Sequence, residues 1–225
     1  MLQKLDHKIK NRKILSRPFT YLATTIPFMQ QQFNELIDSY LENEIGIHTH
    51  FLHPALIKGL QANILQLQKE NLMFPAGIGN RGIKDDNQQM RGDQIYWMDA
   101  GHDNLFEQEF LQLATDFMLQ MNRTCYTGMN DFEFHYAHYQ TGTGYKPHTD
   151  QFANDNHRQF SLINYLNDDW EEKDGGALWA HAADGIQKIS PDAGKTVLFN
   201  SETMLHEVKP STRSRMSITG WLKQI

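Results

Sequence analysis

The stretch DFEFHYAHYQTGTGYKPHTD, residues 131–150, decides the fold that we expect of this chain. A segment rich in aromatic residues is followed by a glycine-rich turn, Gly142-Thr-Gly144, and then by a second short segment. Short apolar segments separated by turn signals continue to the C-terminus, which is typical of antiparallel β-structure. Residues 126–225 are therefore predicted to form a β-sandwich or barrel.

The residues before this β-rich part predict helices. Apolar side chains recur every three or four positions in three stretches, at residues 33–41, 54–67 and 104–121. Pro54 suits the first turn of the second helix, and the stretch 45–51 alternates as a short strand does. Residues 75–93 are rich in Gly, Asn and Asp, which predicts a long loop. The expected class is α+β.

The 225 residues suit one domain with helical additions, and 40% hydrophobic residues suffice for a sizeable core. We expect three parts, namely a basic N-terminal extension (1–25), helical support with the long loop (26–125) and the β core (126–225). The net charge of −6 predicts no affinity for nucleic acid. Cys125 is the single cysteine and no apolar run is long enough for a membrane span, so we expect a cytoplasmic protein.

Two histidines and one aspartate form a candidate metal site. His148 and Asp150 lie two positions apart on a predicted strand, so both side chains leave the same face. His206 begins another β-like segment and can supply the third ligand. Two histidines and a carboxylate leave open coordination positions, an arrangement that suits Fe(II). A structural zinc site would need more cysteine or histidine ligands.

Arg215 is the candidate anchor for an anion. It lies nine residues after His206, in Arg215-Met-Ser217-Ile-Thr219-Gly-Trp221. Strand alternation puts Arg215, Thr219 and Trp221 on one face. An inward arginine needs an anionic partner, and its fork of donors matches a carboxylate. The residues alone leave two partners open, the distal carboxylate of 2-oxoglutarate or an acidic side chain of the protein.

Residues 90–222 resemble the prolyl hydroxylase-domain family, which includes the animal oxygen-sensing hydroxylases and their bacterial relatives. The resemblance extends well beyond the candidate metal ligands. It is carried by Arg91-Gly-Asp93-Gln-Ile-Tyr-Trp97, Tyr139, Gly142-Thr-Gly-Tyr145-Lys-Pro-His148-Thr-Asp150, Asn164-Tyr165-Leu-Asn167-Asp-Asp169-Trp170, Gly175-Gly176, His206-Glu-Val208-Lys-Pro210, Arg215 and Trp221.

The resemblance implies a double-stranded β-helix, which is a cupin-like jelly roll, supported by N-terminal helices. It implies Fe(II) held by His148, Asp150 and His206, with 2-oxoglutarate and O2 as cosubstrates and ascorbate as a candidate reductant for the iron. Other implied roles concern two sets of residues. The distal carboxylate of 2-oxoglutarate would meet Arg215, Tyr165, Tyr139 and Thr219. The peptide substrate would meet Arg158, Trp221, Tyr145 and Asp93, under a lid formed by residues 75–97.

The expected function is hydroxylation of a prolyl residue in a protein, with release of succinate and CO2. The resemblance does not identify the substrate protein, for which the translation machinery is one candidate, or the oligomeric state. One alternative keeps the chemistry but takes a free amino acid or a non-proline side chain. Another alternative, from a different class, is a non-catalytic β-sandwich that binds a metal or a partner.

Overall fold

The computed structural model describes residues 22–77, 90–152 and 154–225. Three long helices and a short 3-10 helix lie within these residues: α1 (Leu22–Asn43), α2 (Pro54–Lys69), α3 (Leu105–Cys125) and η1 (Glu172–Asp174). The strands of the first half and of the centre are β1 (Ile45–His48), β2 (Phe74–Pro75), β3 (Asp93–Trp97), β4 (Asp131–Tyr139), β5 (Tyr145–His148) and β6 (Arg158–Tyr165). The remaining strands are β7 (Leu178–Ala182), β8 (Gly185–Ile189), β9 (Thr196–Asn200), β10 (His206–Val208) and β11 (Arg215–Lys223).

The strands form two antiparallel sheets that face each other. In the described residues, the larger sheet has seven strands in the order β1-β9-β6-β11-β4-β3-β2, and the smaller has four in the order β5-β10-β7-β8. Long crossovers place strands that are distant in sequence side by side, for example β11 between β4 and β6. Two facing sheets with this connectivity are the expected jelly roll, and the predicted fold class is confirmed.

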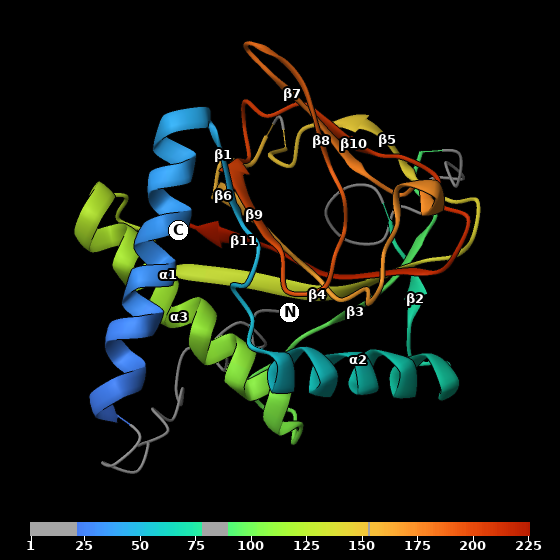
Figure 1. Cartoon of the computed structure of the whole chain (residues 1–225), viewed down its shortest axis with the longest axis horizontal. Coiled ribbons are helices and arrows are strands. Elements are labelled where there is room, and N and C mark those ends of the chain that lie inside the picture. Colours follow the sequence, from blue (N-terminus) through green and yellow to red (C-terminus); the bar gives the residue numbers. More distant parts are fainter. Residues whose placement is uncertain (1–21, 78–89, 153) are drawn as a thin grey trace, which may run out of the picture.

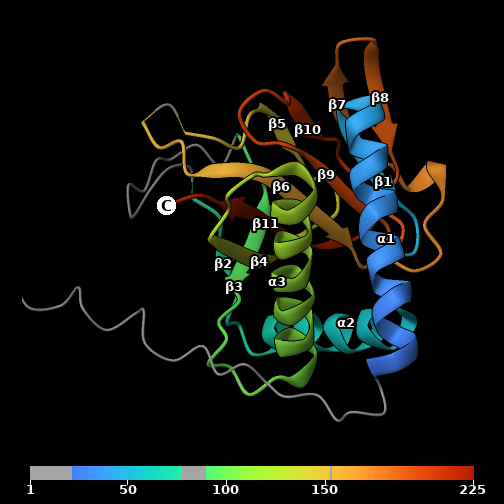
Figure 2. The ribbon, with the colours of Figure 1, turned by 90° about the vertical axis from the view of Figure 1, so that its left-hand side faces the viewer.

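The helices cover the outer face of the larger sheet, so that the molecule has three layers (Figure 1, Figure 2). Strand alternation divides the side chains of β4 between two cores. Phe134 and Tyr136 pack against the helices, whereas Ala137 and Tyr139 point between the two sheets. On β11, Ile218 likewise belongs to the helix side. The side chains on the opposite face of each strand therefore point into the space between the two sheets.

The predicted helices are all present, and local sequence explains their ends. His53 caps α2 by accepting a hydrogen bond from the backbone N–H of Leu56, directly before Pro54. Asn104 caps α3 by accepting from two backbone N–H groups of the first turn. Tyr126 ends α3 in the left-handed conformation. None of the helices in the described ranges is both long and apolar enough to span a membrane.

The expected lid over residues 75–97 differs in part from the structure. Residues 93–97 form strand β3, which pairs along β4 from Asp93 opposite Tyr139 to Trp97 opposite His135. Ile95 is buried between the sheets, and burial of this apolar side chain fixes the strand. The larger sheet thus takes β1, β2 and β3 from before residue 126. Residues 78–89 of the expected loop, and 1–21 of the basic extension, lie outside the described residues.

Candidate active site

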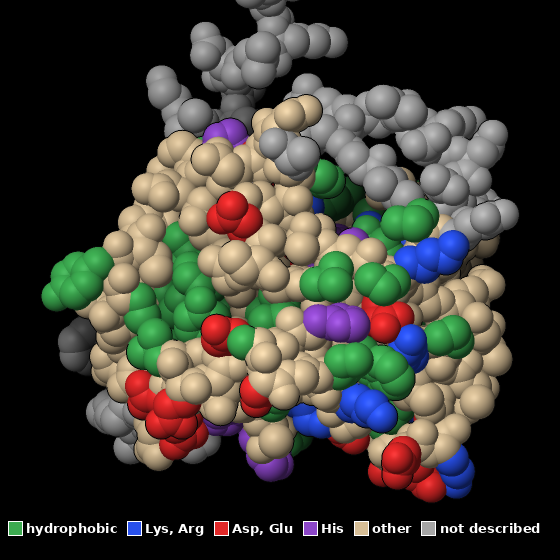
Figure 3. Space-filling model, turned by 90° about the horizontal axis from the view of Figure 1, so that it is seen from above, with side chains coloured by type: hydrophobic (Ala, Val, Ile, Leu, Met, Phe, Trp, Pro, Cys, Tyr) green, Lys and Arg blue, Asp and Glu red, His purple; other side chains and the backbone are tan. Residues whose placement is uncertain are grey.

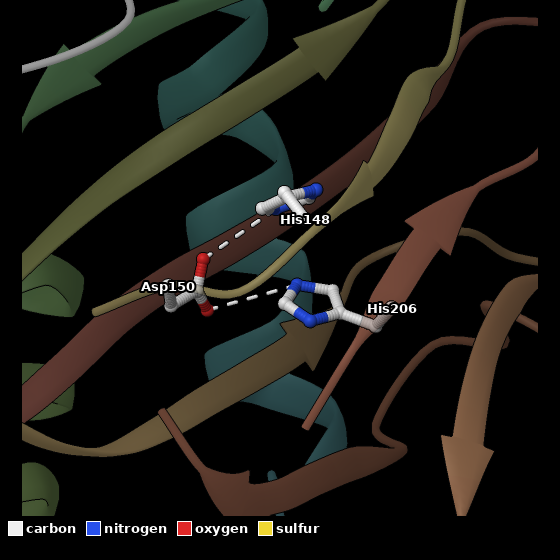
Figure 4. Close-up of side chains that lie close together, drawn as sticks. All are labelled: His148, Asp150 and His206. Carbon is white, nitrogen blue, oxygen red and sulfur yellow. Dashed lines mark ion pairs between the residues drawn. The ribbon is translucent and has the colours of Figure 1, made fainter. Parts of the chain in front are cut away.

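The three candidate metal ligands lie close together in the structure (Figure 4). His148 ends β5 and is paired directly with His206, the first residue of β10. Asp150 follows β5 and points between the two imidazole rings. Its Oδ1 lies 3.5 Å from His148 Nε2, and its Oδ2 lies 3.7 Å from His206 Nε2. The three ligand atoms all lie within 4.8 Å of one another, which is close enough to share one ion.

Backbone carbonyl groups orient both imidazole rings. His148 Nδ1 lies 2.7 Å from the carbonyl oxygen of Lys146, and His206 Nδ1 lies 3.0 Å from that of Met204. A carbonyl oxygen can only accept, so each Nδ1 carries the hydrogen and donates it. Each Nε2 faces Asp150, and in the neutral imidazole that binds a metal it is this atom that carries the lone pair. This is the tautomer that a metal ion requires of a histidine ligand.

Two buried serines hold the Asp150 carboxylate. Ser161 Oγ donates to Asp150 Oδ2 at 2.7 Å and lies 2.9 Å from Ser201 Oγ. Because the Ser161 hydrogen is used on Asp150, Ser201 must donate to Ser161. The backbone carbonyl of Ser201 also accepts from the N–H of Asp150 at 3.1 Å. Burial alone would raise the pKa of Asp150, but the two histidines and Ser161 lower it, so the carboxylate is ionised.

Arg215 occupies the same cavity without an acidic partner. Its side chain is 2% exposed, and its Nε donates to the carbonyl oxygen of Gly176 at 2.9 Å. The guanidinium carbon lies 5.1 Å from the ring centroids of Tyr139 and of Tyr165. Within the described ranges no carboxylate forms an ion pair with Arg215. Of the two partners that the sequence left open, an acidic side chain is therefore not found.

The hydroxyl of Tyr165 also lacks a partner. Its Oη is buried without a hydrogen bond, and burial raises the pKa of this tyrosine to about 12. A neutral hydroxyl beside an unpaired guanidinium suits an anion, because both groups can donate to it. Thr219 and Tyr139 line the same cavity as Arg215 and the three metal-ligand candidates. These residues therefore fit a ligand with a carboxylate at one end and metal-binding groups at the other.

The residues expected to meet the substrate line the same cavity, but their charges are already paired. Arg158 forms an ion pair with Glu133 at 2.7 Å and donates to the carbonyl oxygen of Asp150 at 3.1 Å. Its guanidinium also covers the ring of Trp221, with the guanidinium carbon 3.4 Å from the centroid. Arg158 is thus a fixed part of the cavity wall.

Asp93 and Tyr145 are fixed in a similar way by Arg91 and His148. Both oxygens of Asp93 accept from Arg91, at 2.7 and 2.6 Å, and Arg91 covers the Tyr145 ring at 4.6 Å. Tyr145 in turn stacks on His148, with 3.5 Å between ring centroids. The face seen in Figure 3 is hollowed, and hydrophobic, basic and histidine side chains show within the hollow.

Several residues of the site were not predicted from the sequence. The sequence indicates Arg91 only as part of a motif, and it does not predict roles for Ser161, Ser201, Glu133 or His135, which the structure places at the site. Strand alternation gives one usable signal, because Ser161 shares a face of β6 with Ile163 and Tyr165. Glu133 and Ser201 gave no comparable signal, since their roles depend on crossovers between distant strands.

Comparison with known proteins places this site in a family. Residues 134–223 match the model of the 2OG-Fe(II) oxygenase superfamily, where 2OG is 2-oxoglutarate. The crystal structure of a Pseudomonas putida prolyl-4-hydroxylase has 32% sequence identity and a TM-score of 0.78, covering 86% of this chain and 99% of that one. A prolyl hydroxylase from Trichoplax adhaerens, in complex with a hypoxia inducible factor peptide, shares the fold at 23% identity and a TM-score of 0.78.

Among curated proteins, mouse Egl nine homolog 1 is 29% identical over 148 residues, which are 61% of this chain and 36% of that protein. The chain thus spans little more than a third of the length of this relative. The chain belongs to the 2OG-Fe(II) oxygenase superfamily, and its resemblance to the prolyl hydroxylases within it is confirmed. Fe(II) and 2-oxoglutarate are confirmed as the expected cofactors, and the His-Asp-His donor set fits the iron.

Breaking the Arg91–Asp93 ion pair should reduce stability because the Asp93 side chain is fully buried and that of Arg91 is 13% exposed. We expect Arg91→Ala to lower the free energy of unfolding by about 3–5 kcal/mol, since it leaves a buried carboxylate without its partner. Urea unfolding measures the change. Lys173→Ala, which removes an exposed pair with Glu171, is the control and should cost under about 1 kcal/mol. Equal effects of the two substitutions would contradict this assignment.

Proposed function

We propose that this protein hydroxylates a prolyl residue of a protein substrate, using Fe(II), 2-oxoglutarate and O2 and releasing succinate and CO2. One observation carries the proposal: Arg215 is buried, without an acidic partner among residues 22–77, 90–152 and 154–225, in the cavity that also holds the His148, Asp150 and His206 side chains. The substrate class rests on similarity to the Pseudomonas putida prolyl-4-hydroxylase.

His148, Asp150 and His206 would bind Fe(II) through two Nε2 atoms and one carboxylate oxygen. Two histidines and one carboxylate leave room in the coordination sphere for the cosubstrate and O2. When bound, iron with 2-oxoglutarate supplies the oxidising power that inserts oxygen into an unactivated C–H bond. The protein's own contribution is to hold the two imidazole tautomers and the ionised carboxylate in place before the ion arrives.

Arg215 would bind the distal carboxylate of 2-oxoglutarate, with a hydrogen bond from the Tyr165 hydroxyl. Both groups are buried and lack an acidic partner in the described part of the chain, so a bound carboxylate would satisfy them together. Tyr139 would pack against the guanidinium through its ring, and Thr219 would line the same pocket. The cosubstrate would then span the cavity from Arg215 to the iron site.

Trp221, Tyr145, Arg158 and Asp93 would border the peptide. Ion pairs within the protein already neutralise Arg158 and Asp93, so this part of the cavity offers aromatic faces and no free charge from either residue. Such a surface favours a peptide-bonded proline over a free amino acid, whose ammonium and carboxylate groups need counter-charges. We also propose a cytoplasmic location, which the single cysteine suits, and ascorbate as the reductant that keeps iron reduced.

The decisive experiment compares peptides with free proline. The Fe(II)-loaded protein is incubated with 2-oxoglutarate and either a pool of N-acetylated, C-amidated peptides with a central proline or free L-proline. We expect succinate release and a mass gain of one oxygen with peptides, and neither with Asp150→Ala or His206→Ala. The exposed His157→Ala should retain wild-type turnover. Turnover of free proline alone would replace the proposed substrate, and absence of 2-oxoglutarate binding by the wild type would favour a non-catalytic binding protein.

Arg215→Lys should weaken 2-oxoglutarate binding about 10–100-fold, because lysine keeps the charge but loses the bidentate fork. Calorimetric titration of 2-oxoglutarate into the Mn²⁺-loaded protein measures the Kd. The Mn²⁺ affinity itself should not change, since Arg215 is not among the metal-ligand candidates. An unchanged Kd for 2-oxoglutarate would exclude Arg215 as its anchor.

Ser161→Ala should reduce metal affinity by roughly 10–100-fold, because it removes the hydrogen bond that fixes Asp150 Oδ2. Ser161→Thr keeps a hydroxyl group and should retain most of the affinity. Competition of Mn²⁺ between the protein and a chromogenic chelator measures both variants. Ser39→Ala is a matched control on α1, where the hydroxyl accepts from the backbone of Ile47 far from the metal ligands. Equal metal affinities for Ser161→Ala and the control would rule out the orienting role.

A further inference from the structure

Two buried nitrogen atoms in the cavity wall have no hydrogen-bond partner among the residues that the structure describes. They are Nδ1 of His135, on β4, and Nε1 of Trp221, on β11. Both residues line the cavity that contains the metal-ligand candidates and Arg215. A buried polar group without a partner reduces stability, and a phenylalanine at position 135 would avoid that cost. A ligand that enters the cavity can supply the missing partners.

The neighbouring side chains hold both rings in place. The His135 ring lies 4.9 Å from the Trp97 ring and 5.5 Å from the Trp221 ring, measured between centroids. Trp97 and Thr219 are the residues directly opposite His135 on the two neighbouring strands. Arg158 covers the Trp221 ring at 3.4 Å. Because these contacts restrict rotation of the rings, the two nitrogen atoms cannot easily turn elsewhere for partners.

Apart from Asp150, which belongs to the candidate metal site, the charged side chains near this part of the wall are paired with one another or with Glu133. Burial lowers the pKa of His135 to about 3, so its imidazole is neutral at ordinary pH. The charged side chains nearest to it are Arg91, Asp93 and Arg158, together with Asp150. Arg91 is paired with Asp93, and Arg158 is paired with Glu133. The fitting ligand is therefore uncharged and rich in hydrogen-bonding groups, as a peptide backbone is.

We propose that His135 and Trp221 form a hydrogen-bonding subsite for the backbone of the substrate peptide beside its target proline. The indole N–H of Trp221 can only donate, so it takes a backbone carbonyl oxygen. His135 Nδ1 pairs with a neighbouring backbone polar group. This inference rests on the proposed function and adds His135 as a specificity-determining residue, which favours a peptide-bonded proline over a free one.

The test uses one peptide from the pool of N-acetylated, C-amidated proline peptides, namely the one that the wild-type protein hydroxylates fastest. We expect His135→Phe and Trp221→Phe each to raise its KM about tenfold, because each removes one nitrogen and keeps an aromatic ring. The affinities for Mn²⁺ and for 2-oxoglutarate, measured by calorimetry, should stay within twofold of the wild type. His135→Phe should also raise the melting temperature of the free protein, since it removes a buried polar atom that lacks a partner.

His138→Phe is the matched control. His138 is buried on the same strand, but its side chain faces away from the cavity, where Nε2 lies 2.7 Å from Ser214 Oγ. This substitution removes satisfied hydrogen bonds, so it should lower the melting temperature and leave the peptide KM unchanged. The two histidine variants are thus expected to change stability in opposite directions.

A second variant at the same position keeps the test decisive if His135→Phe fails to fold. His135→Gln retains a polar side chain and should keep the peptide KM within about threefold of the wild type. If the wild type turns over the peptide and both phenylalanine variants show an unchanged KM, the subsite is wrong and the proposed function stands. If the wild type turns over free proline and no peptide, the proposed function and the subsite both fail.

Discussion

A buried carboxylate and a buried guanidinium lie in one cavity without forming an ion pair with each other. Asp150 is 8% exposed and Arg215 is 2% exposed, and each would be costly in a protein interior without a partner. The two sheets keep them apart, since Asp150 follows β5 in the smaller sheet and Arg215 begins β11 in the larger. A metal ion bound at Asp150, together with a metal-binding ligand whose far carboxylate reaches Arg215, would neutralise both charges. The two sheets thus enclose a cavity that suits a ligand bound at both residues.

Strand alternation lets the same strands support a core and a polar cavity. On β11, Ile218 and Leu222 pack against the helices, while Arg215, Thr219 and Trp221 point to the other side. A one-residue shift in register would exchange these two sets and bury the arginine under the helices. The long pairing of β11 with β4 on one side and β6 on the other fixes the register. Packing of the apolar face of β11 against the helices therefore also directs Arg215, Thr219 and Trp221 into the cavity.

Much of the site was predictable because residue type and spacing already limit the chemistry. His148 and Asp150 share a face by alternation, and an inward Arg215 demands an anion. The lid was less predictable. Composition predicts a loop over residues 75–93 and the family resemblance extends the lid to residue 97, but pairing with β4 makes residues 93–97 a strand. Local composition does not show which sheet edge lacks a partner, so tertiary pairing decided that segment.

The charges of Arg158 and Asp93 show a second limit of sequence reasoning. Each was expected to meet the substrate, and each lines the cavity, but Glu133 and Arg91 neutralise them. Whether a charge is free depends on partners supplied by other segments, as with Arg158 and Glu133, which are 25 residues apart. The same holds for the Ser161–Ser201 pair, which forms only because β6 lies beside β9.

Among the described residues, buried polar atoms without a hydrogen-bond partner lie in two places, beside Arg215 and at His135 and Trp221, and the two places suit different ligands. Beside Arg215 lies the Tyr165 hydroxyl, so the missing partner there is an anion. Near the neutral His135 and Trp221, the Arg158 and Asp93 charges are already paired, so the missing partner there is uncharged. A cosubstrate with a carboxylate and an uncharged peptide backbone would therefore use different groups of the protein and would not compete for them.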